Sequence, residues 1–407
     1  MDLLVRDIGR LLTMTGSGAS GAVGDGGEDV IAEAAVVVRD GWITWCGPEE
    51  RLPADLPELP ELDAGGAVVL PGFVDAHTHL IWAGTRREEF AARLAGQTYD
   101  GGGIRTTVSA TRAASGAELL ALAEQRAWLA VSNGTTTMEI KTGYGLTVSD
   151  ELRHLDVIAA LVDRVPLRIE PTYLGAHVVP DGRDADEYVA EVVATVPEAA
   201  AHGARWVDVF CDEGVFTVAQ ARRILQAGRD AGLGLRLHAE EIAHTGAAGL
   251  AAETGCASAD HLEHVSPADA AAMAQAGVVA VLLPTVTLSL RTFAFGQVDV
   301  LRDAGVELAI ATDCNPGTSW GESMPYAVQL ACLVYGLPVL TALRAATRGG
   351  AAALRRDDVG VLVPGRRGDL VVLATDHESD VVAHLGARAV EHTVFGGRVV
   401  ASQGVPA

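Results

Sequence analysis

Two histidines, His77 and His79, follow a largely apolar run from Val68 to Val74 and have the spacing of a metal-binding pair. The run is rich in valine and predicts a buried strand. Residues i and i+2 of a strand point to the same face, so the two imidazoles can hold one ion. A His-x-His pair alone is a weak signal, because either histidine can be a satisfied loop residue. Its place at the C-terminal end of a strand favours chemistry, since parallel barrels carry their active sites there.

Three further residues that can bind a metal end later strand-like runs. They are His238, His261 and Asp313. Three imidazole nitrogens and one carboxylate around an ion, with one position left for water, suit catalytic zinc. Such an ion lowers the pKa of its water to about 7, so hydroxide is available at neutral pH. We interpret His261 as a residue that polarises a substrate carbonyl or orients Asp313, with a satisfied core histidine as the alternative.

Glu241 lies three residues after His238, where a carboxylate can reach the metal-bound water and carry its proton to a leaving nitrogen. Glu240 is an alternative for this role, and a first-turn helix charge is the alternative explanation of Glu241. Another strand-like run ends in Cys211-Asp212-Glu213, without the lysine or histidine that often bridges a second metal. We therefore expect one metal ion per chain.

The elements that must position these residues alternate between apolar runs and helical stretches rich in Ala, Leu, Glu and Arg, which predicts a parallel α/β sheet. Eight such runs match the number of strands in a (β/α)8 TIM barrel of the metal-dependent hydrolase type. The long connection from residue 80 to about 116 predicts a functional, lid-like segment. The predicted barrel strands are 68–79, 135–140, 167–174, 206–210, 234–238, 258–261, 278–283 and 308–313.

Both ends of the chain have short β-type runs and turns in place of this alternation. We expect residues 1–66 and 358–407 to form one small, discontinuous β-sandwich domain, and residues 67–357 to form the catalytic barrel. A chain of 407 residues accommodates one barrel with such a satellite.

Composition excludes several classes of partner. The formal net charge of −23 argues against nucleic acid and anionic membranes, both of which require clustered Lys and Arg. The five cysteines are scattered and include no C-x-x-C pair, which fits a reducing compartment. No apolar run approaches the roughly 20 residues of a membrane span, and the first 15 residues lack a secretory signal pattern. We expect a cytoplasmic protein.

Several segments carry a resemblance to a known family. The His-x-His segment 75–79 and the distant His and Asp mark only the amidohydrolase superfamily, whereas the segments Lys141-Thr142-Gly143-Tyr144-Gly145-Leu146 and Asp208-Val209-Phe210-Cys211-Asp212-Glu213 are much more specific. With these segments the chain resembles the imidazolonepropionases, enzymes of L-histidine breakdown. Further matching segments are 101–108, 174–177, 238–241, 260–264 and 312–317.

The resemblance implies metal-dependent hydrolysis of the ring C–N amide bond of 4-imidazolone-5-propanoate to N-formimidoyl-L-glutamate. It implies one metal ion, expected to be zinc with iron as the alternative, and a homodimer. Hydroxide at the metal would attack the ring carbonyl, with Glu241 as proton shuttle and His261 and Asp313 completing the catalytic set. The implied metal ligands are His77, His79, His238 and Asp313, and the implied substrate contacts are Arg86, Tyr144, His177, Glu241, Asn315, Gly317 and Thr318.

Arg86 would pair with the propanoate carboxylate, because a guanidinium binds a carboxylate through two parallel hydrogen bonds. Two alternatives stay open. One is a deaminase or deiminase of the same superfamily, against which Arg86, Tyr144 and His177 favour a small ring that carries a carboxylate. The other is a scaffold without catalytic activity on the same barrel, which the presence of all four ligand residues disfavours.

Overall fold

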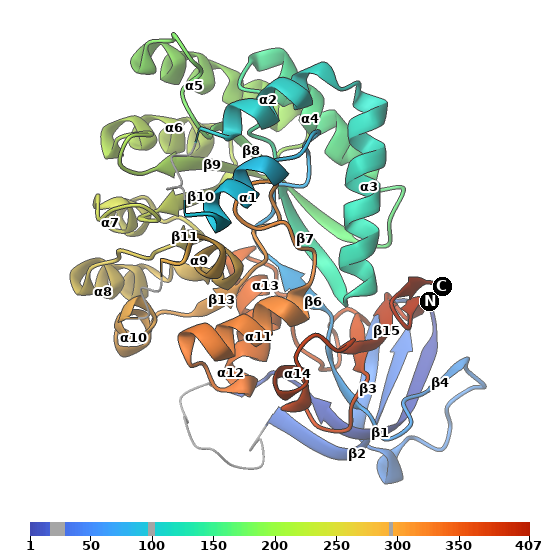
Figure 1. Cartoon of the computed structure of the whole chain (residues 1–407). Helices are drawn as coiled ribbons and strands as arrows, with labels where there is room; N and C mark the ends of the chain where they lie inside the picture. The colour runs from blue at the N-terminus through green and yellow to red at the C-terminus, as the bar shows by residue number, and fades with distance from the viewer. Residues whose placement is uncertain (17–28, 97–101, 293–295) are drawn as a thin grey trace.

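The computed structural model describes residues 1–16, 29–96, 102–292 and 296–407, and its main body is a barrel of eight parallel strands (Figure 1). The strands follow one another around the barrel in chain order, which confirms the predicted (β/α)8 architecture. They are β6 (Phe73–Asp75), β7 (Thr135–Lys141), β8 (Arg168–Ala176), β9 (Trp206–Cys211), β10 (Gly234–Ala239), β11 (Ser258–His261), β12 (Val279–Leu282) and β13 (Leu308–Ile310).

The first predicted barrel strand is divided between two sheets. Its first half, β5 (Val68–Pro71), pairs with strands of the second body, and only β6 belongs to the barrel. The sequence run did not reveal this division because β5 and β6 are both completely buried. Gly72 lies between them, where an added Cβ would come within 2.1 Å of Thr136 Oγ1. The crossing between the sheets therefore requires glycine.

The second body is one mixed sheet built from both ends of the chain together with β5, and the two termini lie beside each other (Figure 1). Strands from both ends contribute to its core, which includes Val5, Val36, Leu370 and Val394. The strands are β1 (Leu3–Leu12), β2 (Val30–Arg39), β3 (Trp42–Pro48), β4 (Glu61–Asp63), β5, β14 (Leu370–Leu373), β15 (Val390–Phe395), β16 (Arg398–Ser402) and β17 (Val405–Pro406).

Helices surround the barrel (Figure 1), and several of them begin with a side-chain cap. Ser115 and Thr217 each form a capping box with the residue three positions later, which satisfies free amides of the first turn. The helices are α1 (Arg87–Leu94), α2 (Ile104–Ala113), α3 (Gly116–Ser132), α4 (Val148–Leu161), α5 (Ala185–Ala201), α6 (Val218–Asp230), α7 (Ala247–Thr254), α8 (Pro267–Ala276), α9 (Pro284–Leu290), α10 (Gly296–Asp303), α11 (Met324–Tyr335), α12 (Val339–Arg344), α13 (Gly350–Ala353) and α14 (Asp380–Ala383). Among the described helices, none has the length and apolar character needed to cross a membrane.

The first and last barrel strands are joined by the segments that follow them. The Asp313 amide donates to the His77 carbonyl at 3.0 Å, and the His79 amide donates to the Cys314 carbonyl at 3.0 Å. Thr78 and Cys314 form the corresponding parallel bridge. The predicted ligand segments therefore also close the barrel.

A single π-helical turn, Ala345–Gly349, packs against β6 and β13 from outside this seam. An added Cβ at Gly349 would lie 2.1 Å from the Leu308 carbonyl oxygen, and one at Gly350 would lie 2.3 Å from the Val74 carbonyl oxygen. These backbone atoms cannot move without displacing the strands. The two glycines thus allow the turn to approach the seam closely.

We expect Gly349→Ala to lower the free energy of unfolding by about 1–3 kcal/mol, because the new methyl group overpacks a backbone contact. Urea unfolding measures the change. Gly116→Ala is the matched control, because its nearest neighbour, Val157 Cγ2, is 3.9 Å from the added Cβ. Alanine there should be neutral or stabilising by about 0.4–1 kcal/mol. Equal losses in both variants would contradict the close packing of the seam.

Candidate metal centre and active site

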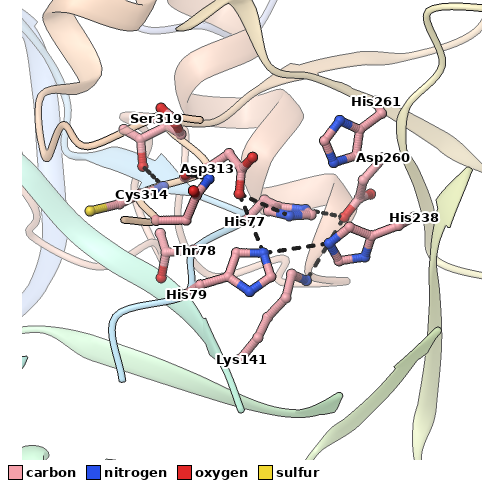
Figure 2. A network of polar contacts seen from close by, with 12 residues as sticks. His77, Thr78, His79, Lys141, His238, Asp260, His261, Asp313, Cys314 and Ser319 are labelled. Carbon is pink, nitrogen blue, oxygen red and sulfur yellow. Dashed lines mark hydrogen bonds and ion pairs between the residues drawn. The ribbon is translucent and has the colours of Figure 1, made fainter. Parts of the chain in front are cut away.

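Three histidines and an aspartate at the ends of three strands, β6, β10 and β13, converge at the C-terminal end of the barrel (Figure 2). His77 Nε2 lies 3.5 Å and His79 Nε2 lies 3.3 Å from the same oxygen, Asp313 Oδ1. His238 Nε2 lies 3.4 Å from His79 Nε2. The structure thus brings together all four residues that the sequence analysis proposes as ligands. His261 lies beside them, with its nearest ring nitrogen within 4.8 Å of those of His77 and His238.

The donor atoms of this cluster fit a metal ion. His77 Nε2 and Asp313 Oδ1 are buried and have no hydrogen-bond partner in the described structure, and unpaired buried polar atoms are unfavourable. Burial lowers the pKa of His77 and His79 well below the usual range, so both imidazoles are neutral and keep a lone pair for a metal. Imidazole nitrogens with one carboxylate are typical of catalytic zinc sites.

The charges around the cluster also leave room for a divalent cation. Buried carboxylates outnumber buried cations around the cluster, and uncompensated buried charge of one sign is strongly unfavourable. A divalent ion would offset part of this charge. The carboxylates include Glu139, Asp208, Asp260 and Asp313, and the cations that contact them are Lys141 and Arg236.

Buried carboxylates orient two of the histidines. Asp260 Oδ2 lies 2.6 Å from His77 Nδ1, and Asp208 Oδ2 lies 3.0 Å from His238 Nδ1. A carboxylate at Nδ1 favours the tautomer that carries its hydrogen there, which leaves the Nε2 lone pair for the metal. Burial alone would lower the pKa of Lys141, but the nearby charges of Asp208 and Glu139 outweigh this effect and raise it.

Several residues at this end of the barrel have left-handed backbone conformations. The φ angles are +59° at Glu240, +79° at His261, +69° at Leu262 and +47° at Asp313. Side chains other than glycine rarely adopt these angles, and such residues cluster at functional sites, where the surrounding structure holds them in place. The conformations place side chains at turns that directly follow buried strands.

The cluster lies in a pocket of about 1500 Å³. The long connection predicted to be lid-like contributes α1 and α2 to its wall; residues 97–101 of that connection lie outside the described part of the chain. Five of the predicted substrate-binding residues besides Glu241 line the pocket, namely Arg86, Tyr144, His177, Asn315 and Thr318. Gly317 instead faces the Arg86 guanidinium, since an added Cβ would lie 2.2 Å from Arg86 Nη1.

Arg86 is almost fully buried and is held by Glu89. Arg86 Nε lies 3.0 Å and Nη2 lies 2.7 Å from the two Glu89 carboxylate oxygens. Glu89 was not identified from the sequence, although the spacing of three residues at a helix start could have indicated the pair. The pair fixes one edge of the guanidinium while Arg86 still lines the pocket.

His177 and Tyr144 form an aromatic wall next to His79. The His177 ring stacks on that of His79 with centroids 5.1 Å apart, and Tyr144 lies 5.3 Å from His177. His177 Nδ1 donates to the Gly143 carbonyl at 3.0 Å. Burial lowers the pKa of His177 well below the usual range. Its Nε2 can therefore accept a hydrogen bond from a ligand N–H group.

Asn315 organises the loop after β13. Its Oδ1 accepts hydrogen bonds from the amides of Gly317 and Thr318, both at 2.8 Å. Its Nδ2 donates to the Asp313 carbonyl at 2.8 Å. Asn315 thus shapes the turn that carries Asp313, besides lining the pocket.

The two glutamates that compete for the proton-shuttle role point in different directions. Glu241 lines the pocket, with Oε2 3.7 Å from His261 Nε2. Glu240 instead accepts from the Gly246 amide at 2.8 Å and lies 3.1 Å from His244. Burial and the charges of Glu263 and Asp313 raise the pKa of Glu241 well above its usual range. A raised pKa favours uptake of a proton by this carboxylate, as a general base requires.

Asp212, which follows β9, binds backbone amides of a neighbouring loop. Its carboxylate accepts hydrogen bonds from the amides of Ile242 at 2.9 Å and Ala243 at 3.1 Å. It therefore fixes the loop that follows Glu241. Burial raises the pKa of the neighbouring Cys211 to about 12, which keeps its thiol protonated.

The supporting carboxylates and Lys141 were also missed as parts of the site. Glu139 and Lys141 are two residues apart in a strand that is otherwise apolar or hydroxyl-bearing, and both are completely buried. Two charges on the same inward face of a buried strand are a signal that could have identified them. Asp208 and Asp260 had no such local pattern.

The barrel and the candidate metal cluster at its C-terminal end have the arrangement of a metal-dependent hydrolase. Residues 68–400 match the Amidohydrolase family. The chain is 48% identical over 375 residues to an imidazolonepropionase of Salinispora arenicola, with 91% of this chain and 92% of the relative covered. It is 45% identical over 400 residues to that of Mycolicibacterium smegmatis, with 98% and 97% covered. The chain belongs to the amidohydrolase family and, within it, to the imidazolonepropionases.

Solved structures with low sequence identity share the fold. An adenosine deaminase from Xanthomonas campestris with bound zinc gives a TM-score of 0.74 at 21% identity, with 100% of this chain and 94% of that chain covered. An ochratoxinase from A. niger gives 0.75 at 19% identity, with 99% and 96% covered. These similarities support the architecture of barrel and mixed sheet.

We expect a chelator to lower the melting temperature and Zn²⁺ to restore it, because a bound ion satisfies the unpaired donors. At a hundredfold excess over its Kd, the ion adds about 2.7 kcal/mol to the free energy of unfolding. Mg²⁺, which prefers oxygen ligands, should not replace Zn²⁺. Thermal unfolding with each ion measures the effect.

His77→Ala should abolish this response to Zn²⁺, whereas His384→Ala, at an exposed position in the second body, should retain it. A wild-type melting temperature that is unchanged by both chelator and Zn²⁺ would contradict a metal centre at this cluster.

Proposed function

We propose that this protein hydrolyses 4-imidazolone-5-propanoate to N-formimidoyl-L-glutamate. The observation that carries the proposal is the similarity of 42–48% identity, over nearly the whole chain, to relatives named imidazolonepropionase. The pocket supports it, because a candidate metal cluster and a buried arginine face the same cavity. A small ring that carries a carboxylate matches these two features.

The proposed metal ligands are His77, His79, His238 and Asp313, and the proposed ion is zinc, with iron as the alternative. A bound divalent metal would supply Lewis acidity, which polarises a carbonyl and lowers the pKa of water. The short distances among the four residues, together with the unpaired atoms His77 Nε2 and Asp313 Oδ1, support this ligand set.

In the proposed reaction, water adds across the ring amide bond. The hydroxyl group joins the carbonyl carbon, the C–N bond breaks, and a proton joins the departing ring nitrogen. Glu241 would accept the proton from water and deliver it to that nitrogen. His261, 3.7 Å from Glu241, would orient this carboxylate or polarise the carbonyl.

Arg86 would bind the propanoate carboxylate, and His177 and Tyr144 would contact the ring. The Glu89 pair supports the role of Arg86, because it presents the guanidinium to the pocket in a fixed orientation. Asn315 and Thr318 would complete the binding site, Asn315 also through the turn that it holds. Gly317 would act indirectly, because it leaves room for the Arg86 guanidinium.

The direct test is an assay with freshly prepared 4-imidazolone-5-propanoate, following its ultraviolet absorbance and measuring metal content. Loss of substrate with formation of formimidoylglutamate, at about one metal per chain as a single catalytic site requires, would support the proposal. Release of ammonia from a purine-like or formimidoyl substrate, with this imidazolone untouched, would favour the deaminase alternative. Protein that binds no metal and has no activity would favour the scaffold.

A homodimer and a cytoplasmic location are further parts of the proposal. The resemblance to the family supports the first, and the cysteine pattern and composition support the second. Light scattering of the purified protein tests the dimer.

We expect Glu241→Gln to lower kcat by about 10²–10⁴-fold, because the amide cannot transfer the proton. Metal content should remain, since Glu241 is not among the proposed ligands. Glu240→Gln is the matched control, because its carboxylate contacts Gly246 and His244. Comparable losses of kcat in the two folded variants would argue against Glu241 as the shuttle.

We expect Arg86→Ala mainly to raise KM, by about 10–100-fold, because a charge-assisted hydrogen bond contributes roughly 1.5–3 kcal/mol. Arg87→Ala removes the neighbouring exposed arginine and should leave KM close to that of the wild type. An unchanged KM in Arg86→Ala would exclude this anchor.

A further inference from the structure

Lys141 is the single lysine of the chain, and the other 29 of the 30 basic side chains are arginines. It ends β7, and its side chain is completely buried. An ammonium group is compact and has three donors arranged as a tetrahedron, whereas a guanidinium is planar and larger. The one lysine therefore occupies an enclosed position where arginine is a poor substitute.

The Lys141 ammonium lies among three buried carboxylates, and Figure 2 shows it beside one of them, Asp260. Its Nζ is 2.8 Å from Glu139 Oε1, 2.8 Å from Asp208 Oδ2 and 3.9 Å from Asp260 Oδ2. These carboxylates come from β7, β9 and β11, which are alternate strands of the barrel. Side chains from alternate strands form one layer of a barrel interior. In this protein that layer contains charged side chains, namely the three carboxylates and the Lys141 ammonium.

Two of these carboxylates are shared with histidines of the proposed ligand set. Asp208 Oδ2, the oxygen that contacts Lys141, also lies 3.0 Å from His238 Nδ1. Asp260 Oδ2 lies 2.6 Å from His77 Nδ1 and 3.1 Å from Arg236 Nη2. One ammonium is thus linked through two carboxylates to two imidazoles on different strands.

We propose that Lys141 is a positioning residue: its ammonium holds Asp208 and Asp260 against the Nδ1 atoms of His238 and His77, so that both Nε2 atoms face one metal ion. Lys141 does this without touching the metal. The ammonium also takes the place that a second cation would need among these carboxylates. The inference rests on the ligand set of the proposed function.

The physical reason is the high energy of unpaired buried charge. Without the ammonium, Glu139 and Asp208 lose their nearest cation and Asp260 keeps only Arg236. Removing one partner from a buried ion pair is strongly unfavourable. The carboxylates would then take up protons or move, and the imidazoles would lose their fixed orientation.

Zinc affinity, measured by competition with a chromophoric chelator and without substrate, tests the proposal. We expect Lys141→Met to weaken zinc binding by about 10–100-fold, the usual effect of losing a group that supports a metal ligand. Lys141→Arg should also weaken it, because the charge remains but the planar group does not fit. A folded Lys141→Met protein with wild-type zinc affinity would overturn the proposal.

Arg168→Met is the matched control. Arg168 begins β8, at the other end of the barrel, and forms an ion pair with the buried Asp369. Its loss should lower the melting temperature without changing zinc affinity. If Arg168→Met weakened zinc binding as much as Lys141→Met, the effect would be one of general stability and the specific role would be refuted.

If Lys141→Met does not fold, Asp208→Asn and Asp260→Asn decide the matter. Each keeps the shape of the side chain and should weaken zinc binding, whereas wild-type affinity in both would overturn the proposal. Selective ¹⁵N-lysine labelling adds a test on the wild type, because it gives one side-chain signal. That signal should shift when Zn²⁺ binds, and an identical signal with and without Zn²⁺ would count against the link.

Because zinc binding is measured without substrate, failure of the proposed function is a separate result. A wild type that binds zinc but leaves the imidazolone intact would refute the activity and leave the role of Lys141 standing.

Discussion

The backbone pairing between residues 77–79 and 313–314 is the contact on which barrel and site both depend. β6 and β13 are strands of three residues each, and the segments that follow them carry the two hydrogen bonds described at the seam. Asp75 adds a second link, because it accepts from the Thr312 amide at 3.1 Å and the Thr312 hydroxyl at 2.6 Å. The backbone hydrogen bonds that close the barrel therefore also bring His77, His79 and Asp313 together.

The pocket differs in charge from the molecule as a whole. The chain carries a net charge of −23, whereas the wall of the pocket contains both arginines and carboxylates. The arginines are Arg86, Arg93, Arg105, Arg112 and Arg291, and the carboxylates are Asp181, Glu213, Glu241 and Asp313. An arginine in the wall can attract an anionic group locally, although the net charge of the protein repels it.

Much of the fold could be predicted from the sequence, because barrel strands are buried on both sides and read as apolar runs between helices. The ligands could be predicted for a related reason: residues that follow parallel strands meet at one end of a barrel. The division of the run 68–75 between two sheets could not, since β5 and β6 are equally buried and only the packing of Gly72 on Thr136 separates them.

The supporting network was less accessible to sequence reasoning. Asp260 lies 183 residues from His77, and no periodic pattern links positions so far apart. The sequence could not decide which of Glu240 and Glu241 faces the pocket. Both are glutamates at adjacent positions, and the direction of each side chain depends on the conformation of the loop. The Arg86–Glu89 pair has a helical spacing, but its place in the pocket depends on the folding of the whole connection around α1 and α2.

The burial of the only lysine has a practical consequence for chemistry on the folded protein. Reagents that acylate lysine side chains do not reach Lys141 while the barrel is closed, because its side chain is completely buried. Lys141 becomes available only when the barrel opens. Its acylation, or cleavage after it by a lysine-specific protease into two fragments, therefore counts opened molecules and reports how often the interior of the barrel meets solvent.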